Sequence, residues 1–307
     1  MGRELADRFP VAAATFAEAD EALGFALSHL CFDGPDDLLR LTENTQPAIL
    51  TASIAAARVL AEHGVQPTLA AGHSLGEWTA HVAAGTLSFA DAVRSVRARG
   101  RAMQLAIPPG QGAMAAVLQL DAAQVAEACK EAAAETGLTV QAANLNSPGQ
   151  TVISGAHAAV EKASALAKAK GARRAVLLPV SAPFHCALMQ PAQEEVARVL
   201  AELALSDPRI PVAANVTGGL VTVAAEAQDA LVRQVTGAVR WVDCVQTLKS
   251  AGADVYIEVG PGKVLCGLLK QIDPTLKTLN VEDEASLAKT LAELNTAASQ
   301  LVESARN

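Results

Sequence analysis

The sequence of 307 residues predicts an α/β protein in which a smaller domain is inserted into a larger one. Two observations lead to this fold class. An apolar segment, a glycine-flanked serine and a helical run follow one another at residues 68–84, and the spacing of strands and helices changes between residues 112 and 180. Hydrophobic residues make up 51% of the chain and charged residues 18%, which is typical of a globular protein.

The composition argues against several function classes. A net charge of −8 disfavours non-specific binding to nucleic acid or to an anionic membrane. No apolar run is long enough to span a bilayer and no signal-peptide pattern follows Met1, so we expect a cytoplasmic protein. The five cysteines are dispersed and odd in number, which predicts reduced core thiols rather than metal ligands or disulfides.

The elements ahead of the serine are predicted to be helical. Two short helical patterns in the first forty residues are interrupted at Gly34-Pro35, and a clearer helix is expected from Pro47 to His63. Proline in the first turn and Gly64 just beyond the end are the residues that helix boundaries prefer.

The pentapeptide Gly72-His73-Ser74-Leu75-Gly76 matches the G-x-S-x-G nucleophile elbow in the strand–turn–helix setting that the motif needs. Its glycines allow a sharp bend where a Cβ would clash, so the serine hydroxyl is left exposed at the head of a helix. The N–H of Leu75 would then face a developing oxyanion. The alternative is a glycine-rich turn with an ordinary serine, because five-residue matches recur by chance.

A helix is predicted over residues 88–106, and it carries one arginine on its apolar side. At 100° per residue, Arg99 falls in the apolar stripe, whereas the other three arginines share a solvated face. A buried guanidinium needs an anionic partner. On spacing alone, that partner is either a structural Asp or Glu or the carboxylate of a substrate.

Between residues 112 and 180 the elements follow the order β-α-β-β-α-β, which is the ferredoxin-like pattern. Strands are expected at 113–120, 138–144, 150–154 and 175–180, helices at 121–136 and 157–170, and a hairpin turn at 146–149. We therefore predict an α/β-hydrolase-like core with a mostly parallel sheet in residues 1–108 and 182–307, and an inserted ferredoxin-like subdomain in residues 109–181.

The chain returns to the larger domain at residues 181–186, a stretch of small residues that contains His185. A lone histidine is more often structural than catalytic, but few histidines are available to a serine nucleophile here. His73 adjoins Ser74 and is the weaker base candidate, because consecutive side chains on a tight turn diverge. Further along, strands are expected at 210–214 and 255–259, and helices at 187–203, 225–235, 241–251, 263–272 and 284–303.

Five segments, in the same order along the chain, closely resemble the malonyl-CoA:acyl carrier protein transacylases of type II fatty acid synthesis. They are Gly72–Glu77, Arg99-Gly100, Asn146–Gln150, Ser181–Met189 and Glu258–Leu265. The resemblance implies transfer of a malonyl group from coenzyme A to the phosphopantetheine thiol of acyl carrier protein. It implies ping-pong chemistry through a malonyl-serine, with no metal and no redox cofactor.

The resemblance also implies catalytic roles for four residues. Ser74 would be the nucleophile and His185 the base that takes its proton. The third member would be a backbone carbonyl rather than an aspartate, at the position of Gln234, and a neutral acceptor can still fix the imidazole tautomer. Leu75 N–H would serve as the oxyanion donor.

Four further residues are expected at the acyl pocket. Arg99 would grip the free malonyl carboxylate, which is the anion that its inward direction requires. Gln46 matches a glutamine near the pocket of the family, and His73 adjoins the nucleophile. Phe184 would fill the space beside the α-carbon and disfavour branched malonates.

The expected partners are malonyl-CoA and acyl carrier protein, and we expect the chain to act as a monomer. Arg173, Arg174 and Lys263 are candidates for meeting the acidic carrier or the phosphates of the coenzyme, or else are simply solvated charges. Two other functions remain open. One is a serine hydrolase or thioesterase on the same scaffold, and the other is a catalytically impaired homologue that binds the carrier protein.

One departure from the family concerns the start of the chain. Family members carry an apolar strand and a Phe-Pro-Gly-Gln-Gly-Ser-Gln segment before the residues that match Met1-Gly2, and this chain lacks both. We expect this to remove a core strand and one oxyanion donor. Loss of one such donor typically lowers the rate on the order of 10²- to 10³-fold.

Overall fold

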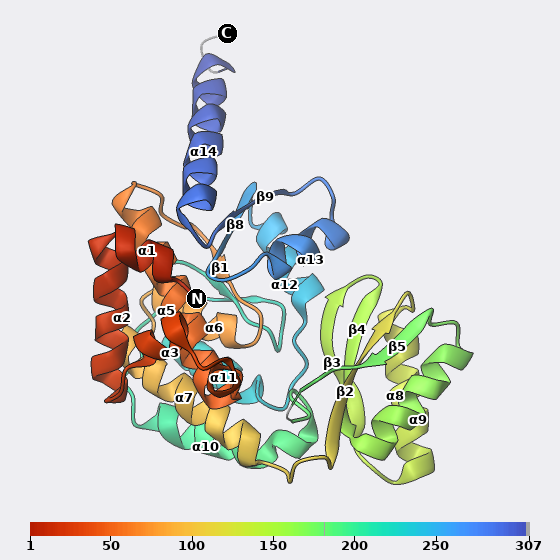
Figure 1. The fold of residues 1–307 in the computed structure, drawn as a ribbon. Helices are drawn as coiled ribbons and strands as arrows, with labels where there is room; N and C mark the ends of the chain where they lie inside the picture. Colours follow the sequence, from red (N-terminus) through yellow and green to blue (C-terminus); the bar gives the residue numbers. More distant parts are fainter. Residues whose placement is uncertain (181, 305–307) are drawn as a thin grey trace.

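The computed structural model describes residues 1–180 and 182–304, with side chains described as far as residue 296. Figure 1 shows a larger, helix-rich part beside a smaller part built on a β-sheet. This arrangement confirms the predicted α/β class. Within the described ranges, no helix is both long and apolar enough to cross a membrane.

Five helices open the chain, and the last of them is longer than predicted. They are α1 (Arg3–Arg8), α2 (Pro10–Leu23), α3 (Leu27–Asp33), α4 (Asp36–Leu39) and α5 (Thr42–Glu62). α5 begins at Thr42 rather than at Pro47, so the proline lies inside the helix. Proline cannot donate to the carbonyl four residues before it, but Pro47 is buried with most of the residues that follow it. Packing therefore outweighs the missing hydrogen bond.

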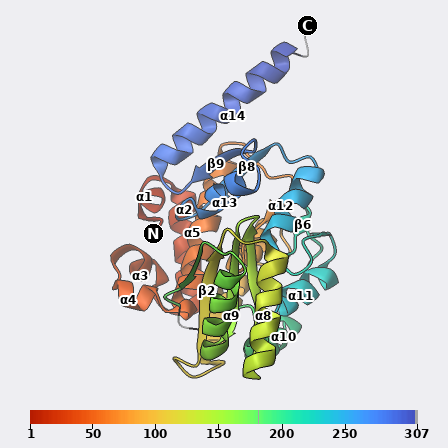
Figure 2. The same cartoon turned by 90° about the vertical axis from the view of Figure 1, so that its right-hand side faces the viewer.

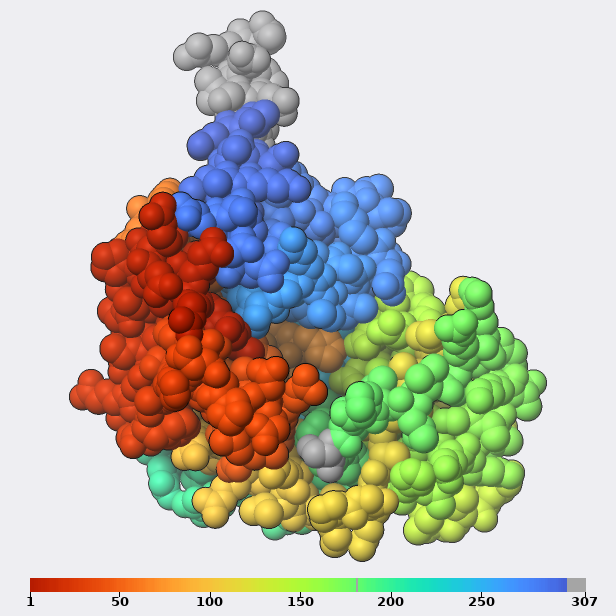
Figure 3. All heavy atoms as spheres, in the orientation of Figure 1, coloured from red at the N-terminus to blue at the C-terminus, as the bar shows by residue number. Residues whose placement is uncertain are grey.

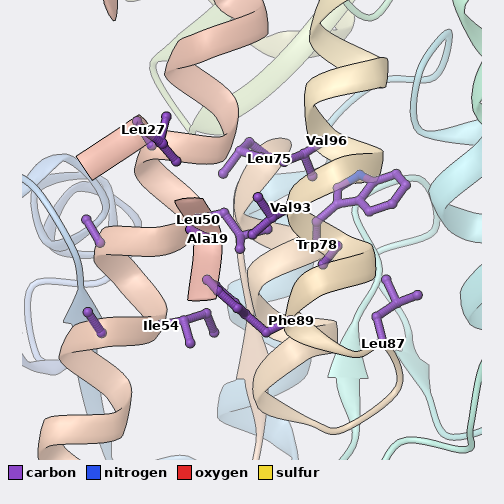
Figure 4. Packing of buried hydrophobic residues seen from close by; sticks show 14 of the residues in the cluster. Ala19, Leu27, Leu50, Ile54, Leu75, Trp78, Leu87, Phe89, Val93 and Val96 are labelled. Carbon is purple, nitrogen blue, oxygen red and sulfur yellow. The ribbon is translucent and has the colours of Figure 1, made fainter. Parts of the chain in front are cut away.

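The helix after the serine packs into the main core. α6 (Leu75–Ala83) and α7 (Phe89–Leu105) are joined by a short loop, and Ser88 caps α7 by accepting from the Asp91 N–H. Figure 4 shows Leu75 and Trp78 of α6 among apolar side chains of α5 and α7. This packing fixes the start of α6 and, with it, the position of the residue just before the helix.

The smaller part holds four antiparallel strands and two helices. The strands are β2 (Gly112–Leu118), β3 (Val140–Ser147), β4 (Gln150–Ala156) and β5 (Arg174–Leu177), in the order β3-β4-β2-β5. The helices α8 (Ala122–Thr136) and α9 (His157–Ala169) lie on one side of this sheet in Figure 2. Alternate strand residues such as Ala115, Val117 and Ile153 are buried in one cluster with the helices.

The hairpin between β3 and β4 turns more tightly than predicted. β3 continues to Ser147 and β4 begins at Gln150, so only Pro148-Gly149 forms the turn. Asn146 thus belongs to a strand rather than to the loop. Its position is fixed by strand pairing, which matters for the site described below.

The larger part contains two small sheets instead of the single, mostly parallel sheet that we expected. β1 (Ala70–Ala71) pairs in parallel with β6 (Val212–Ala213), which pairs antiparallel with β7 (Leu220–Val221). β8 (Val255–Val259) and β9 (Lys277–Val281) form a separate parallel pair. Pro67 and Pro211 lie just before β1 and β6, and a residue without an N–H limits how far a ladder extends. β7 and β9 were not predicted.

The remaining elements are mostly helical and follow the predictions to within a few residues. They are the 3₁₀ turn η1 (Ala187–Met189), α10 (Gln190–Ala201), α11 (Ala224–Arg233), α12 (Trp241–Ser250), α13 (Val264–Ile272) and α14 (Glu284–Ser304). Figure 1 shows α14 projecting away from the rest of the molecule.

Candidate active site

The glycine-flanked serine forms a tight bend between β1 and α6. Ser74 has φ 53° and ψ −106°, a sparsely populated conformation for a residue with a side chain. A Cβ on Gly72 would lie 1.9 Å from the carbonyl carbon of Gly76, so only glycine fits at residue 72. The prediction that a Cβ would clash at both glycines of the motif is wrong for Gly76. A Cβ added there would meet nothing within 4 Å beyond its own helix and chain neighbours.

Leu75 is the first residue of α6, and its side chain is buried in the main core. Its N–H belongs to the first turn, where N–H groups have no partner within the helix. The positive end of the helix dipole therefore lies beside Ser74 and favours negative charge there. The strand–turn–helix setting confirms the predicted elbow, while oxyanion binding by Leu75 stays a prediction.

The structure brings His185 to the serine, although 111 residues separate them in the chain. His185 Nε2 lies 2.7 Å from Ser74 Oγ, and Nδ1 lies 2.8 Å from the backbone carbonyl oxygen of Gln234. A carbonyl only accepts, so Nδ1 carries the proton and Nε2 is left to accept from the serine hydroxyl. His185 is buried with φ 58°, so its surroundings hold the strained backbone that aims the ring.

The buried imidazole is expected to stay neutral over a wide pH range. Burial, with the positive charge of Arg99 as the second cause, lowers the pKa of His185 to about 3. We expect its imidazole NMR signals to stay unchanged from about pH 8 to about pH 5, whereas a histidine in a short peptide titrates near about 6.5. Because the unfolded chain binds a proton that the folded chain does not, His185 lowers folding stability as the pH falls from about 6.5 to about 3. Titration of His185 near the peptide value would contradict this.

Arg99 enters the site from α7 and is 1% exposed, which confirms the prediction that it turns inward. α7 crosses α5 closely at Gly100, where a Cβ would lie 2.6 Å from the Thr42 carbonyl oxygen. The close crossing brings Arg99 next to Gln46 of α5, and Arg99 Nη1 donates to Gln46 Oε1 at 2.6 Å. Gly100 therefore helps to determine how deeply the guanidinium of Arg99 lies inside the protein.

The guanidinium of Arg99 faces neutral oxygens. Its Nη2 donates to Ser74 Oγ at 3.0 Å and to Gln234 Oε1 at 2.8 Å, while its buried Nε–H has no partner among the described residues. Burial lowers the pKa of Arg99 to about 10 against the opposing effect of Glu77, so the group stays charged at neutral pH. Arg99 forms no ion pair with a carboxylate in the described part of the chain. Its buried positive charge could therefore bind an anionic ligand.

The sequence alone did not indicate a role for two polar residues of the site, Glu77 and Asn215. Both are fully buried. Glu77 Oε2 accepts from Gln234 Nε2 at 2.6 Å, and Asn215 Oδ1 accepts from the Ser74 N–H at 2.7 Å. A signal for each existed in the chain, because Glu77 is an acid in an apolar helix start and Asn215 follows a buried strand whose end meets the elbow.

His73 and Phe184 lie beside the nucleophile and the base in sequence but make different contacts. His73 Nε2 lies 2.8 Å from Asn146 Oδ1, and its ring is 5.6 Å from that of Trp241. This hydrogen bond ties the elbow to β3, and burial lowers the pKa of His73. Phe184 is half-buried and packs against both the main core and a cluster on the small sheet, so it bridges the two parts.

The three candidate surface cations differ in their surroundings. Lys263 lies 3.5 Å from Glu282, so its charge is partly compensated. Arg173 and Arg174 are exposed and form no ion pair with any residue in the described ranges. They border a cavity of about 520 Å³ together with Gln119, Ser147, Gln150 and Gln271.

Figure 3 shows a hollow between the N-terminal helices, the region of α13 and the small sheet. In residues 1–180 and 182–304, no group of three or more His, Cys, Asp or Glu side chains is arranged to hold a metal ion. All five cysteines are free.

The comparisons with known proteins agree with one another. A family model described as an acyl transferase domain matches residues 1–303. The malonyl CoA-acyl carrier protein transacylase of Salmonella typhimurium is 48% identical over 95% of this chain and 94% of its own length. The crystal structure of an acyl carrier protein S-malonyltransferase from Vibrio cholerae has a TM-score of 0.91 and 48% identity, covering 94% of both chains.

A further solved structure is a malonyl-transacylase in complex with a type II PKS acyl-carrier protein. It has a TM-score of 0.92 and 46% identity, covering 95% of this chain and 94% of the other. The family model spans nearly the whole chain, and relatives close to half identical cover about 95% of it. The chain therefore belongs to the acyl transferase family.

Proposed function

We propose that the chain is a cytoplasmic acyltransferase that moves a malonyl group from coenzyme A to the phosphopantetheine thiol of acyl carrier protein. A malonyl-serine is the intermediate. One observation carries the proposal: Ser74 Oγ lies 2.7 Å from a neutral imidazole and 3.0 Å from a buried guanidinium. The base and the cation therefore both contact the nucleophilic oxygen, and the cation is available to bind the free carboxylate of the malonyl group.

In the first half-reaction, Ser74 Oγ attacks the thioester carbonyl carbon while its proton passes to His185 Nε2. The Leu75 N–H stabilises the oxyanion that forms. When the intermediate collapses, the C–S bond breaks and His185 returns its proton to the leaving thiolate of coenzyme A. The backbone carbonyl of Gln234 holds the imidazole in the required tautomer throughout, and it does so without a carboxylate.

In the second half-reaction, the carrier's thiol gives its proton to His185 and attacks the malonyl ester. The ester bond to Ser74 then breaks, and the serine oxygen recovers the proton from the imidazole. The same pair therefore serves in both directions, which is the basis of ping-pong transfer. No metal or redox group is needed to balance either step.

The acyl pocket is proposed to consist of Arg99, Gln46, His73 and Phe184. Arg99 binds the free carboxylate of malonate, and Gln46 orients the guanidinium through Nη1. His73, held by β3, shapes the wall next to the nucleophile. Phe184 occupies the space beside the α-carbon, and a methylmalonyl-CoA competition assay tests that assignment.

We also propose how the two parts of the chain divide. Residues 109–181 would form a ferredoxin-like subdomain inserted into an α/β-hydrolase-like core of residues 1–108 and 182–307. The strand order β3-β4-β2-β5, with antiparallel neighbours and two helices on one side, supports the first assignment. The parallel β1–β6 pair leading into the elbow supports the second. Ser181 and residues 305–307 lie outside the described residues.

Intact-mass measurement after exposure to malonyl-CoA tests the function. We expect one malonyl adduct on the native protein, and its loss when holo acyl carrier protein is added. Steady release of free malonate without an acceptor would instead indicate a hydrolase. Carrier-protein binding without any adduct would indicate a homologue that does not catalyse transfer.

The exposed arginine pair is proposed to help receive the acidic carrier. The pair has no acidic partner in the described part of a chain whose net charge is −8. Reversing both charges, Arg173→Glu with Arg174→Glu, is expected to raise the KM for acyl carrier protein roughly tenfold, and less at high salt. The control is Lys289→Glu, an exposed cation on α14. If the two variants raised the KM for acyl carrier protein equally, Arg173 and Arg174 would not be part of the docking surface.

A further inference from the structure

Behind the elbow lies a buried polar layer that the transfer chemistry does not use directly. Glu77 and Asn215 are both 0% exposed. A buried carboxylate is costly unless its surroundings satisfy it, so its presence so close to the nucleophile calls for an explanation. Among the described residues, neither side chain is hydrogen-bonded to the Ser74 hydroxyl or the His185 ring.

Asn215 holds the two sides of the bend together. Its Oδ1 accepts from the Ser74 N–H at 2.7 Å, and its Nδ2 donates to the Gly72 carbonyl at 2.8 Å. Ser74 occupies a backbone conformation that persists only where the surroundings hold it. The asparagine supplies that restraint, and its own backbone N–H donates to Glu77 Oε2 at 3.1 Å.

Glu77 provides the shortest of the three acceptors that face the amide nitrogen of Gln234, the others being the Ser74 carbonyl and, at 3.5 Å, Asn215 Oδ1. Gln234 Nε2 donates to Glu77 Oε2 at 2.6 Å and to the Ser74 carbonyl at 2.9 Å. Both partners only accept, so the NH₂ group must face them and Oε1 must face the other way. There Oε1 accepts from Arg99 Nη2 at 2.8 Å. The orientation of the guanidinium is therefore linked to the carboxylate through one amide.

This linkage survives a change in the charge of Glu77. Burial raises the pKa of Glu77 to about 7, against the opposing hydrogen bonds from Gln234 and Asn215 and the charge of Arg99. Oε1 of Glu77 is buried without a hydrogen-bond partner in the described chain. A proton on Oε1 leaves Oε2 free to accept, so the amide of Gln234 keeps its direction in both charge states.

We propose that Glu77 is a positioning residue for acyl-group selection, which acts through the amide of Gln234 to orient the Arg99 guanidinium toward a carboxylate-bearing acyl group. The inference rests on the proposed function, because Arg99 selects malonyl over acetyl only if malonyl transfer occurs. It assigns Asn215 mainly to the elbow, because its side chain contacts Ser74 N–H and the Gly72 carbonyl at 2.7 and 2.8 Å and the Gln234 amide only at 3.5 Å.

The test compares acylation of Ser74 by malonyl-CoA and by acetyl-CoA, with the adducts followed by intact mass. Glu77→Met keeps the length of the side chain but removes the acceptor, so the malonyl-to-acetyl rate ratio is expected to fall roughly tenfold, the effect of one hydrogen bond. Glu77→Gln retains an acceptor oxygen and is expected to keep most of the ratio. Asn215→Ala removes only a long contact to the Gln234 amide, so it should slow both substrates and lower the ratio less than Glu77→Met does.

A control separates positioning from loss of stability. Val160→Ala removes core volume in α9, away from the site, and should lower the melting temperature without changing the ratio. If Glu77→Met slows both substrates equally, or if Glu77→Gln loses the ratio as fully as Glu77→Met, the proposal is overturned.

A second measurement does not depend on activity. The side-chain amide protons of Gln234 should exchange slowly with solvent in the native protein and in Glu77→Gln, and faster in Glu77→Met. Fast exchange in the native protein would refute the positioning role. Failure of the native protein to form any acyl-serine would instead refute the proposed function, and the exchange result would still stand.

Discussion

Replacing Ser74 by alanine is expected to abolish the malonyl-enzyme and to lower kcat on the order of 10⁶-fold, as when one member of a nucleophile–base pair is lost. Replacing His185 by alanine should have nearly the same effect, because the hydroxyl then has no acceptor at 2.7 Å. The double variant should be no slower than either single one, since the two residues act as a unit. Steady-state transfer and intact mass measure these outcomes.

The matched control for the histidine is His157→Ala. His157 lies at the start of α9 with a half-buried side chain, its Nδ1 3.6 Å from Glu161, and forms no hydrogen bond or ion pair with the Ser74 site in the described chain. The His157→Ala variant should retain full activity. Additive losses in the Ser74 and His185 variants would contradict a shared step, and an adduct on the Ser74→Ala protein would place the nucleophile elsewhere.

Replacing Arg99 by alanine is expected to remove the preference for malonyl-CoA. A malonyl carboxylate that enters the site would then be buried without a partner, a loss of about 2–5 kcal/mol, which corresponds to roughly 30- to 4,000-fold in kcat/KM. Acetyl-CoA has no such carboxylate, so its kcat/KM should change far less. Loss of the nearby positive charge should also raise the pKa of His185 relative to the native protein.

The control for this variant is Arg101→Ala on the same helix, because Arg101 is exposed on the outer face of α7. It should leave both substrates unaffected. Arg99→Lys is not expected to rescue, since an ammonium group cannot reproduce the planar set of contacts to Gln46, Gln234 and Ser74. An unchanged malonyl-to-acetyl ratio in Arg99→Ala would show that another group binds the carboxylate.

Much of the site followed from local sequence because its elements are local. The elbow needs only a strand, a glycine and a helix start in succession, and the inward direction of Arg99 follows from helical periodicity. The sheet formed by β1, β6 and β7 in the larger part was harder to predict. Its strands are as short as two residues, beside Pro67 and Pro211, and such short segments carry no readable alternation of apolar and polar positions.

The chain by itself determined that a serine sits on a tight turn and that one arginine must lie inside. Only the tertiary structure decided what meets them, because hydrogen bonds across 111 to 160 residues depend on how helices and strands pack and not on spacing. Gly100 shows this best. It lets α7 approach α5 within reach of Gln46, and that contact, with the amide of Gln234 held by Glu77, fixes the orientation of a buried cation.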